Sequence, residues 1–481
     1  MTKRSDEDLQ TVSAGDAMPK AVSRQAVRSI VEEAFCTEGD IEESARRVAV
    51  LARIAVLRQR TGDAPGCAGA LSMALAAARD IDDDARALAL ARIARARAKT
   101  GDWQGWRETA AKALTSIAPG PVEGARACAL TELAMAEAEA GDVAAAVALA
   151  ERCPQGRVRD RVLDGIARLA SAAGEVSQAL VAARAIAGSD ERALRLAEIV
   201  RTQGKAGDST GAAGLIVEAL EAARQVADEF DRTLWLVEIC RAQVAIGDLP
   251  GATRSIAEAV SVARLAEDES GRAHALCFIA RNQPALGNLV EPATLLDEAS
   301  RAIRRIGGES CRAGSLCELA EAKARTGDRP GALRSIAEAR EAAKGEAGDG
   351  EWHRHWHVGD IAVAQAIAGE TGAARATARQ LSRDGGNDGL LGDICDGLCW
   401  GNAVSDAVAT AREIVCARAR ARTFVNVARY QAREGDTDGA GEAILFALEA
   451  ADAVAESPER ADALVEIAEM ALEAAAEGGP G

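Results

Sequence analysis

Residues 231–252 read DRTLWLVEICRAQVAIGDLPGA and contain every part of a unit that recurs along the chain. Leu236 and Ile239 stand eleven and eight residues before Gly247, and Ala252 stands five residues after it. Spacings of three and four residues place apolar side chains on one stripe of a helix. The glycine is suited to a left-handed helix end, and Asp248 is suited to cap the next helix. The stretch therefore predicts a helical hairpin.

The same unit recurs over most of the chain at intervals of 33 to 42 residues. The longer units exceed the shorter ones by about seven residues, or two helical turns, so an insertion of that size keeps the apolar stripe facing the same way. A sustained period of this length is typical of a helical repeat array. The turn residues are Gly62, Gly101, Gly141, Gly174, Gly207, Gly247, Gly287, Gly327, Gly369, Asn402 and Gly435.

Composition supports an all-α fold. Apolar residues make up 48% of the 481 residues, but aromatic residues only 2%, and alanine dominates. Alanine is the best helix former, and its small side chain favours close packing between helices. Alternating runs of β-branched and aromatic residues, which indicate strands, do not occur.

The Leu-x-x-Ile-Ala stripe, the Gly-Asp turn and the following alanine resemble the pattern of tetratricopeptide-repeat proteins over residues 24–475. Leu, Arg, Gln or Lys fill the bulky aromatic positions of that family. The resemblance implies that a peptide or helix of another protein binds along a concave groove lined by the first helix of each hairpin. The expected fold is an all-α, right-handed superhelical solenoid of about 11–12 antiparallel helix hairpins.

Five segments are predicted along the chain. Residues 1–20 are polar and aperiodic, and form a disordered N-terminal tail. Residues 21–383 form the helical repeat array, and residues 384–402, DGGNDGLLGDICDGLCWGN, form an irregular glycine-rich weak repeat or hinge, because its six glycines weaken a helix. Residues 403–475 hold the C-terminal repeats and a capping helix, and residues 476–481 form a flexible tail.

Charge and cysteine usage exclude several classes of function. A net charge of −17 disfavours nucleic acid as a partner. No apolar stretch approaches the roughly 20 residues of a membrane span, and the N-terminus has no apolar segment typical of a secretory signal. The eleven cysteines are scattered without a Cys-x-x-Cys pair, which is typical of reduced thiols used as core residues. We expect a cytoplasmic protein.

An arginine stands fifteen residues before the turn in nearly every unit, at the start of the first helix. The helix dipole disfavours a cation there, so a local partner must offset it. We expect these arginines to act as structural staples to nearby carboxylates or to carbonyls of a neighbouring repeat. The column comprises Arg47, Arg86, Arg126, Arg159, Arg192, Arg232, Arg272, Arg312, Arg354 and Arg420, with Arg460 in the last helix.

Residues 351–357, EWHRHWH, hold three of the four histidines and two of the six tryptophans. On a helix, His353 and His357 share a face, with Asp360 close by, and this set suits Zn²⁺ or Ni²⁺. The motif lacks the glutamate of a metal-dependent hydrolase. Ordinary packing and a partner contact centred on Trp356 are the alternatives.

A second arginine column stands six residues before the turn and, by the resemblance, faces the groove. Its members could attract an acidic segment, and glutamines two residues further on could bond a peptide backbone. The alternative is a solvated face held by intrahelical ion pairs such as Glu198–Arg201. Arg281 is informative because Phe278 stands where the paired acid would be. The candidate set is Arg168, Arg201, Arg241, Arg281, Gln203, Gln243 and Gln283.

The chain contains no phosphate-binding Gly-x-x-x-x-Gly-Lys-Ser/Thr loop and no Gly-x-Ser-x-Gly nucleophile motif. We therefore expect a non-catalytic protein-protein interaction scaffold without a cofactor. Two alternatives stay open: a regulatory sensor or adaptor of a signalling system, and a metal-dependent protein centred on His353 and His357. The sequence identifies neither the partner nor the oligomeric state.

Overall fold

The computed structural model describes residues 24–38, 41, 43–117, 124–205, 209–344, 350–381, 388–455 and 457–477. Within these ranges the secondary structure is entirely helical, with 24 α-helices and two short 3₁₀ helices, η1 (Ala78–Asp80) and η2 (Gln283–Leu286). The predicted all-α class is therefore confirmed. The tail predicted at residues 1–20 lies outside the described residues, as do residues 478–481 of the tail predicted at 476–481, whereas residues 476 and 477 end the last helix.

The helices form antiparallel hairpins that stack side by side in two layers. The first helices are α3 (Ser44–Arg60), α5 (Asp83–Thr100), α7 (Ala125–Glu139), α9 (Arg157–Ala172), α11 (Ser189–Lys205), α13 (Glu229–Ala245), α15 (Glu269–Asn282), α17 (Glu309–Arg325), α19 (Gly350–Ile367), α21 (Asp388–Trp400), α23 (Ala417–Arg433) and α25 (Ser457–Glu477). The second helices are α4 (Ala64–Ala77), α6 (Trp103–Ser116), α8 (Val143–Glu151), α10 (Val176–Ala185), α12 (Ser209–Arg224), α14 (Leu249–Leu265), α16 (Pro292–Ile303), α18 (Arg329–Lys344), α20 (Thr371–Leu381), α22 (Val404–Ala411), α24 (Thr437–Asp452) and, at the other end of the chain, α2 (Arg24–Glu38).

The turns have the predicted geometry. Nine of the predicted turn glycines have φ between 73° and 88°, and Asn402 has φ of 59°, so the residue in each turn is left-handed. Asp248 then caps the second helix, because its carboxylate accepts the Gly251 N–H at 2.9 Å. Gly207 lies outside the described residues. The same aspartate cap occurs at Asp63, Asp102, Asp142, Asp328 and Asp436.

The apolar stripes form the core between the two layers. Leu236 and Ile239 are at most 1% exposed, as are most of their equivalents in the other units. Seven cysteines are also buried here as free thiols, which confirms their use as core residues. Burial raises the pKa of the Cys240 thiol to about 12, so this group stays protonated at neutral pH.

The arginines fifteen residues before the turns act as staples, as predicted. The Arg232 guanidinium donates to the Val226 carbonyl at 2.9 Å, and that of Arg272 donates to the Ala266 carbonyl at 2.6 Å. These carbonyls lie just after the preceding second helix and have no partner within it. The negative end of that helix offsets the unfavourable position of the cation at the start of its own helix. Arg86, Arg159, Arg192 and Arg420 make equivalent bonds.

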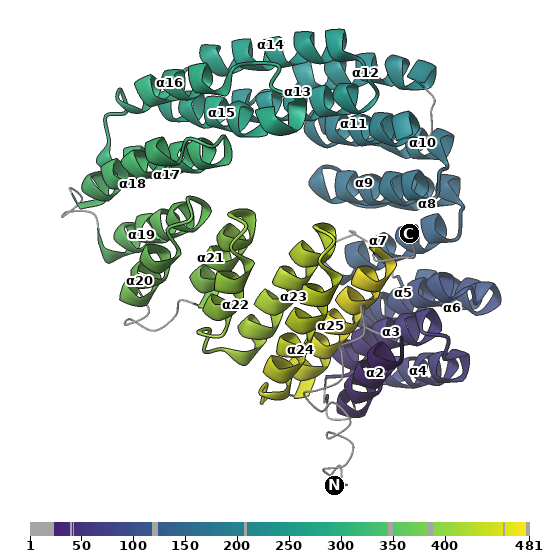
Figure 1. Ribbon diagram of the computed structural model, residues 1–481. Coiled ribbons are helices and arrows are strands. Elements are labelled where there is room, and N and C mark those ends of the chain that lie inside the picture. The colour runs from purple at the N-terminus through teal and green to yellow at the C-terminus, as the bar shows by residue number, and fades with distance from the viewer. Residues whose placement is uncertain are drawn as a thin grey trace.

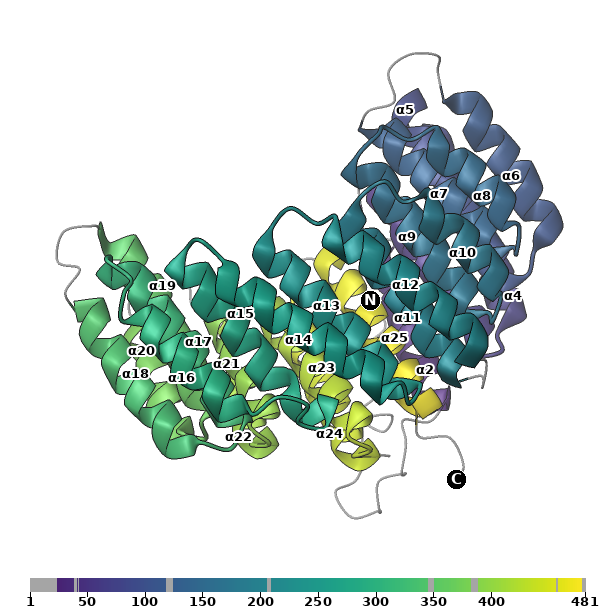
Figure 2. The ribbon, with the colours of Figure 1, turned by 90° about the horizontal axis from the view of Figure 1, so that it is seen from above.

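The first and last described helices pack together, so the array closes into a ring (Figure 1). Helix α25 packs between α23 and α3 in the first-helix layer, and α2 packs on α25 as its second helix. Arg460, near the start of α25, pairs with Glu33, near the end of α2, at 2.6 Å, which shows that this pair is antiparallel. Arg53 pairs with Glu469 at 2.7 Å across the same junction. The turned view shows α13–α16 in front of α21–α24, on the other side of the ring (Figure 2).

Ring closure corrects one expectation about the ends. The C-terminal helix is not a cap at an open end, because it is the first helix of a hairpin completed by α2. The buried apolar residues of α2 and α25 belong to one continuous cluster. Twelve hairpins are thus present in the described part of the chain, at the upper end of the predicted range. The right-handed sense of the superhelix stays a prediction.

The glycine-rich segment is helical from Asp388 to Trp400. A side chain at Gly397 would lie 3.3 Å from the Ala366 Cβ, and one at Gly401 would lie 3.0 Å from the Ala366 carbonyl oxygen. These glycines therefore allow α21 to approach α19 closely, which offsets their low helix propensity. This part of residues 384–402 is regular rather than irregular, and the hinge stays a prediction.

Candidate partner-binding surface

The first helices line the inside of the ring (Figure 1). We call the face that they present there the inner surface. It carries a groove of about 330 Å³ along α3 and α5. Ala52, Val56 and Ala96 contribute apolar contact area, and four cations surround them: Arg53, Arg92, Arg95 and Lys99.

Three of the four cations in this groove are held by carboxylates. Arg95 pairs with Glu132 at 2.9 Å and with Glu139 at 3.0 Å, and Lys99 lies 3.5 Å from Glu139. Burial raises the pKa of the Glu139 carboxyl, and the nearby cations oppose this shift. Arg53 pairs with Glu469, whereas Arg92 makes no ion pair within the described part of the chain. This groove was not predicted from the sequence, although Arg53 and Arg92 both stand nine residues before a turn.

The predicted arginine stripe lies on α9, α11, α13 and α15. Arg168 is exposed and makes no ion pair with a described residue, because Asp164 pairs instead with Arg195 at 2.6 Å. Arg241 lies 3.3 Å from Glu238, within its own helix, and donates to Asn282 of the next first helix at 2.6 Å.

The other two stripe arginines are partly neutralised. Arg201 lies 3.9 Å from Glu198, as the intrahelical alternative predicts. Arg281 has a partner that intrahelical spacing does not reveal, because its guanidinium lies 3.4 Å from Glu321 on α17 and over the Phe278 ring. The stripe therefore mixes a free arginine with partly neutralised ones.

The three glutamines do not belong to this surface, which corrects that part of the predicted site. Gln203, Gln243 and Gln283 are 9%, 2% and 0% exposed. Residues two apart on a helix point in nearly opposite directions, so a glutamine two residues after an inward arginine faces the second helix. Gln243 accepts a hydrogen bond from Ser255 of α14 at 2.7 Å and donates to the capping Asp248 at 3.2 Å. It joins the two helices of its hairpin.

The predicted metal set is only partly described. His353, Trp356 and His357 fall in α19, but their side chains lie outside the described residues. Asp360 is described and half-buried, close enough to raise the pKa of Glu318. Among the described side chains, no group of three His, Cys, Asp or Glu residues could hold a metal ion. The metal alternative and the Trp356 contact stay predictions.

Beyond the arginine stripe, α15, α17 and α19 bring a histidine and several acids together. His274 Nδ1 lies 3.6 Å from the Glu318 carboxylate, and its ring lies against Phe230. Burial raises the pKa of Glu318 to about 7, and Glu321 and Asp360 add to this shift against the opposing effect of Arg281. Burial also lowers the pKa of His274. The uncharged forms of both groups are therefore favoured.

Replacing Glu318 with glutamine should stabilise the protein at pH 8 but not at pH 4.5. An acid whose pKa is raised on folding stabilises the protein fully when the pH is below the pKa of the unfolded state. This contribution is lost as the pH rises through the folded-state pKa of about 7. Because the side chain is 37% exposed, we expect a gain of only about 1 kcal/mol at pH 8. Urea denaturation of E318Q and the parent protein at both pH values measures it. Equal gains at the two pH values would contradict the raised pKa.

The solved structures that resemble this chain superpose on it only loosely. No family model and no curated protein matches the chain. A Rap protein complexed with competence and sporulation factor covers 78% of this chain and 99% of its own length, at 10% identity and a TM-score of 0.28. The match to yeast Tom70 covers 89% of this chain and 96% of that protein, at 13% identity and a TM-score of 0.23. The match to a circular tandem repeat protein covers 95% of this chain and 97% of that protein, at 14% identity and a TM-score of 0.17. Their superposition is too loose to match single positions.

The repeat unit itself is tetratricopeptide-repeat-like, as predicted. It consists of two antiparallel helices joined by a left-handed turn and stacked on the next pair. None of the described helices is long and apolar enough to cross a membrane.

Proposed function

We propose that the protein is a non-catalytic scaffold whose inner surface binds a carboxylate-bearing segment of a partner protein. The observation that carries this proposal is Arg92, which lines the groove of α3 and α5 without an ion pair in the described part of the chain. The protein has a net charge of −17, so acidic side chains are abundant, and an arginine without a carboxylate beside it is unusual. Its guanidinium can take a carboxylate with two parallel hydrogen bonds.

The walls of the groove favour an acidic peptide over a free anion. Ala52, Val56 and Ala96 offer apolar contact area to the aliphatic part of a Glu side chain. Arg95 and Lys99 already have carboxylate partners, and they add positive potential around Arg92. Arg168 lies two first helices beyond Arg92 and is a second arginine without an ion pair to a described residue, which the same extended segment would approach. The glutamines contribute to folding rather than to recognition.

Charge reversal at Arg92 tests the proposal. The probe is a fluorescein-labelled hexaglutamate peptide, and hexalysine is its opposite-charge control. We expect Arg92→Glu to weaken hexaglutamate binding about 10- to 100-fold at low salt, because a charge-assisted hydrogen bond contributes about 1.5–3 kcal/mol. The variant should also flatten the salt dependence of binding. Fluorescence anisotropy at several salt concentrations measures both effects.

Arg254 provides the matched control, because it is exposed on second helix α14 and Arg254→Glu changes the net charge equally. We expect this variant to bind the probe like the parent protein. Equal losses in both variants would show that only overall charge matters, and an unchanged affinity in Arg92→Glu would reject the groove.

A further inference from the structure

A ladder of ion pairs connects successive second helices on the outside of the ring. Arg184 of α10 pairs with Glu218 of α12 at 3.1 Å, and two further rungs follow in the same register, 34 residues apart in sequence. These are Arg224–Glu258 and Arg264–Glu298, both at 2.7 Å. Hydrogen bonds from the two arginines lower the pKa values of Glu258 and Glu298.

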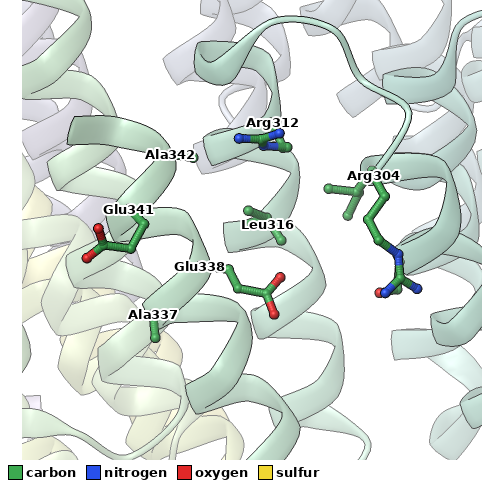
Figure 3. Close-up of a pocket in the computed structure, with 9 residues that line it drawn as sticks. Arg304, Arg312, Leu316, Ala337, Glu338, Glu341 and Ala342 are labelled. Carbon is green, nitrogen blue, oxygen red and sulfur yellow. The ribbon is translucent and has the colours of Figure 1, made fainter. Parts of the chain in front are cut away.

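The next rung of this ladder is open. The register pairs Arg304 with Glu338, but these residues make no ion pair with each other or with any other described residue. A cleft of about 610 Å³ separates α16 from α18 at this point. Figure 3 shows Arg304 on one side and Glu338 on the other, with Leu316 of α17 close to Glu338.

The open rung differs from the closed ones in where its helix ends. Arg184, Arg224 and Arg264 belong to the last turns of their helices. Helix α16 ends at Ile303, so Arg304 follows it as the capping residue, with a backbone that is still in the right-handed helical region. Both Arg304 and Glu338 are exposed, and each keeps its hydrogen-bonding capacity. The cleft thus presents an unused cation and an unused anion around buried Leu316.

We propose that this cleft binds a short peptide segment of a partner that carries an acidic and a basic side chain on either side of an aliphatic one. The acidic side chain of the partner pairs with Arg304, and its basic side chain pairs with Glu338. The aliphatic side chain lies on Leu316 and Ile303 at the back of the cleft. The volume falls within the range of about 300–1,000 Å³ typical of ligand sites. The cleft lies outside the inner surface and is independent of the function proposed there.

The first test asks whether the rung is open in solution. Arg264→Glu should lower the melting temperature, and adding Glu298→Arg should restore it, because that pair is closed. Arg304→Glu and Glu338→Arg should show no such mutual rescue. Rescue at Arg304 and Glu338 equal to that at the closed rung would show that the cleft is shut, and would overturn the proposal.

The second test measures recognition with a fluorescein-labelled, C-terminally amidated peptide of sequence Glu-Leu-Ala-Arg. We expect the parent protein to bind it at least tenfold more tightly than the peptide Gln-Leu-Ala-Gln. Arg304→Glu should weaken binding of the charged peptide at least tenfold, while Arg264→Glu on the closed rung leaves it unchanged. No binding by the parent protein, or equal affinity in Arg304→Glu, excludes this ligand class at the cleft.

Discussion

Removal of α2 should cost about 5 kcal/mol of stability, although this helix stands at one end of the sequence. Val27, Ile30, Val31 and Ala34 are at most 5% exposed, and most of this burial depends on the closed ring. Fully burying an aliphatic side chain contributes about 1.5–3 kcal/mol, and the apolar face of α25 would lose its cover as well. Urea denaturation of a chain without residues 1–38 measures the loss.

A chain without residues 1–23 is the matched control, because it keeps α2 complete. We expect it to unfold at the same urea concentration as the full chain. A synthetic peptide of residues 24–38, added in trans, should restore part of the stability of the shorter chain, because α2 is a separate helix that docks on a formed surface. If both truncated chains unfold at the same urea concentration, α2 does not close the ring in solution.

The hairpin could be predicted because its determinants are local. Gly247, Asp248 and the Leu236–Ile239 stripe lie within one unit, and each acts on its neighbours within a few residues. Asn402 could be placed in the same register because asparagine tolerates a left-handed backbone better than most residues, and its φ of 59° agrees. Repetition of one local pattern along the chain then fixed the architecture.

Ring closure could not be predicted from the repeat pattern. Each repeat adds a small rotation to the array, and a difference of a few degrees per unit decides between an open superhelix and a closed ring. The chain nevertheless contains one signal for it. Among the described helices, residues 24–38 form a second helix with no first helix before it, and residues 457–477 form a first helix with no second helix after it. Two unpaired apolar faces at opposite ends of a chain can cover each other.

The candidate site was predicted only in part, because its charges depend on contacts between repeats. Intrahelical spacing correctly indicated Glu238 beside Arg241. It did not reveal Glu321 beside Arg281, because the relative heights of neighbouring first helices set this contact. The same limit applies to the open rung at Arg304, because the spacing along the chain is the same as in the closed rungs.

Replacing Gln283 with leucine should cost about 2 kcal/mol of stability and leave partner binding unchanged. Gln283 is fully buried, and its side-chain oxygen accepts the Val290 N–H at 2.9 Å while its amide donates to the Ile279 carbonyl. Leucine fills a similar volume but leaves the Val290 N–H without its acceptor, and an unmet buried donor costs about 1–3 kcal/mol. Urea denaturation measures the stability, and anisotropy with the hexaglutamate probe measures the binding.

Gln59→Leu is the control, because this side chain is exposed at the end of α3, and an exposed substitution of this kind stays within about 0.5 kcal/mol. The two measurements separate the roles that sequence and structure assign to these glutamines. Replacing a binding residue would lower probe affinity with little effect on the free energy of unfolding. Replacing a residue that joins the two helices of a hairpin would lower the free energy of unfolding with little effect on probe affinity. A tenfold loss of probe affinity in Gln283→Leu with unchanged stability would show that Gln283 contacts the partner on the inner surface. The burial and hydrogen bonds of Gln243 and Gln283 favour a role in holding the hairpin together.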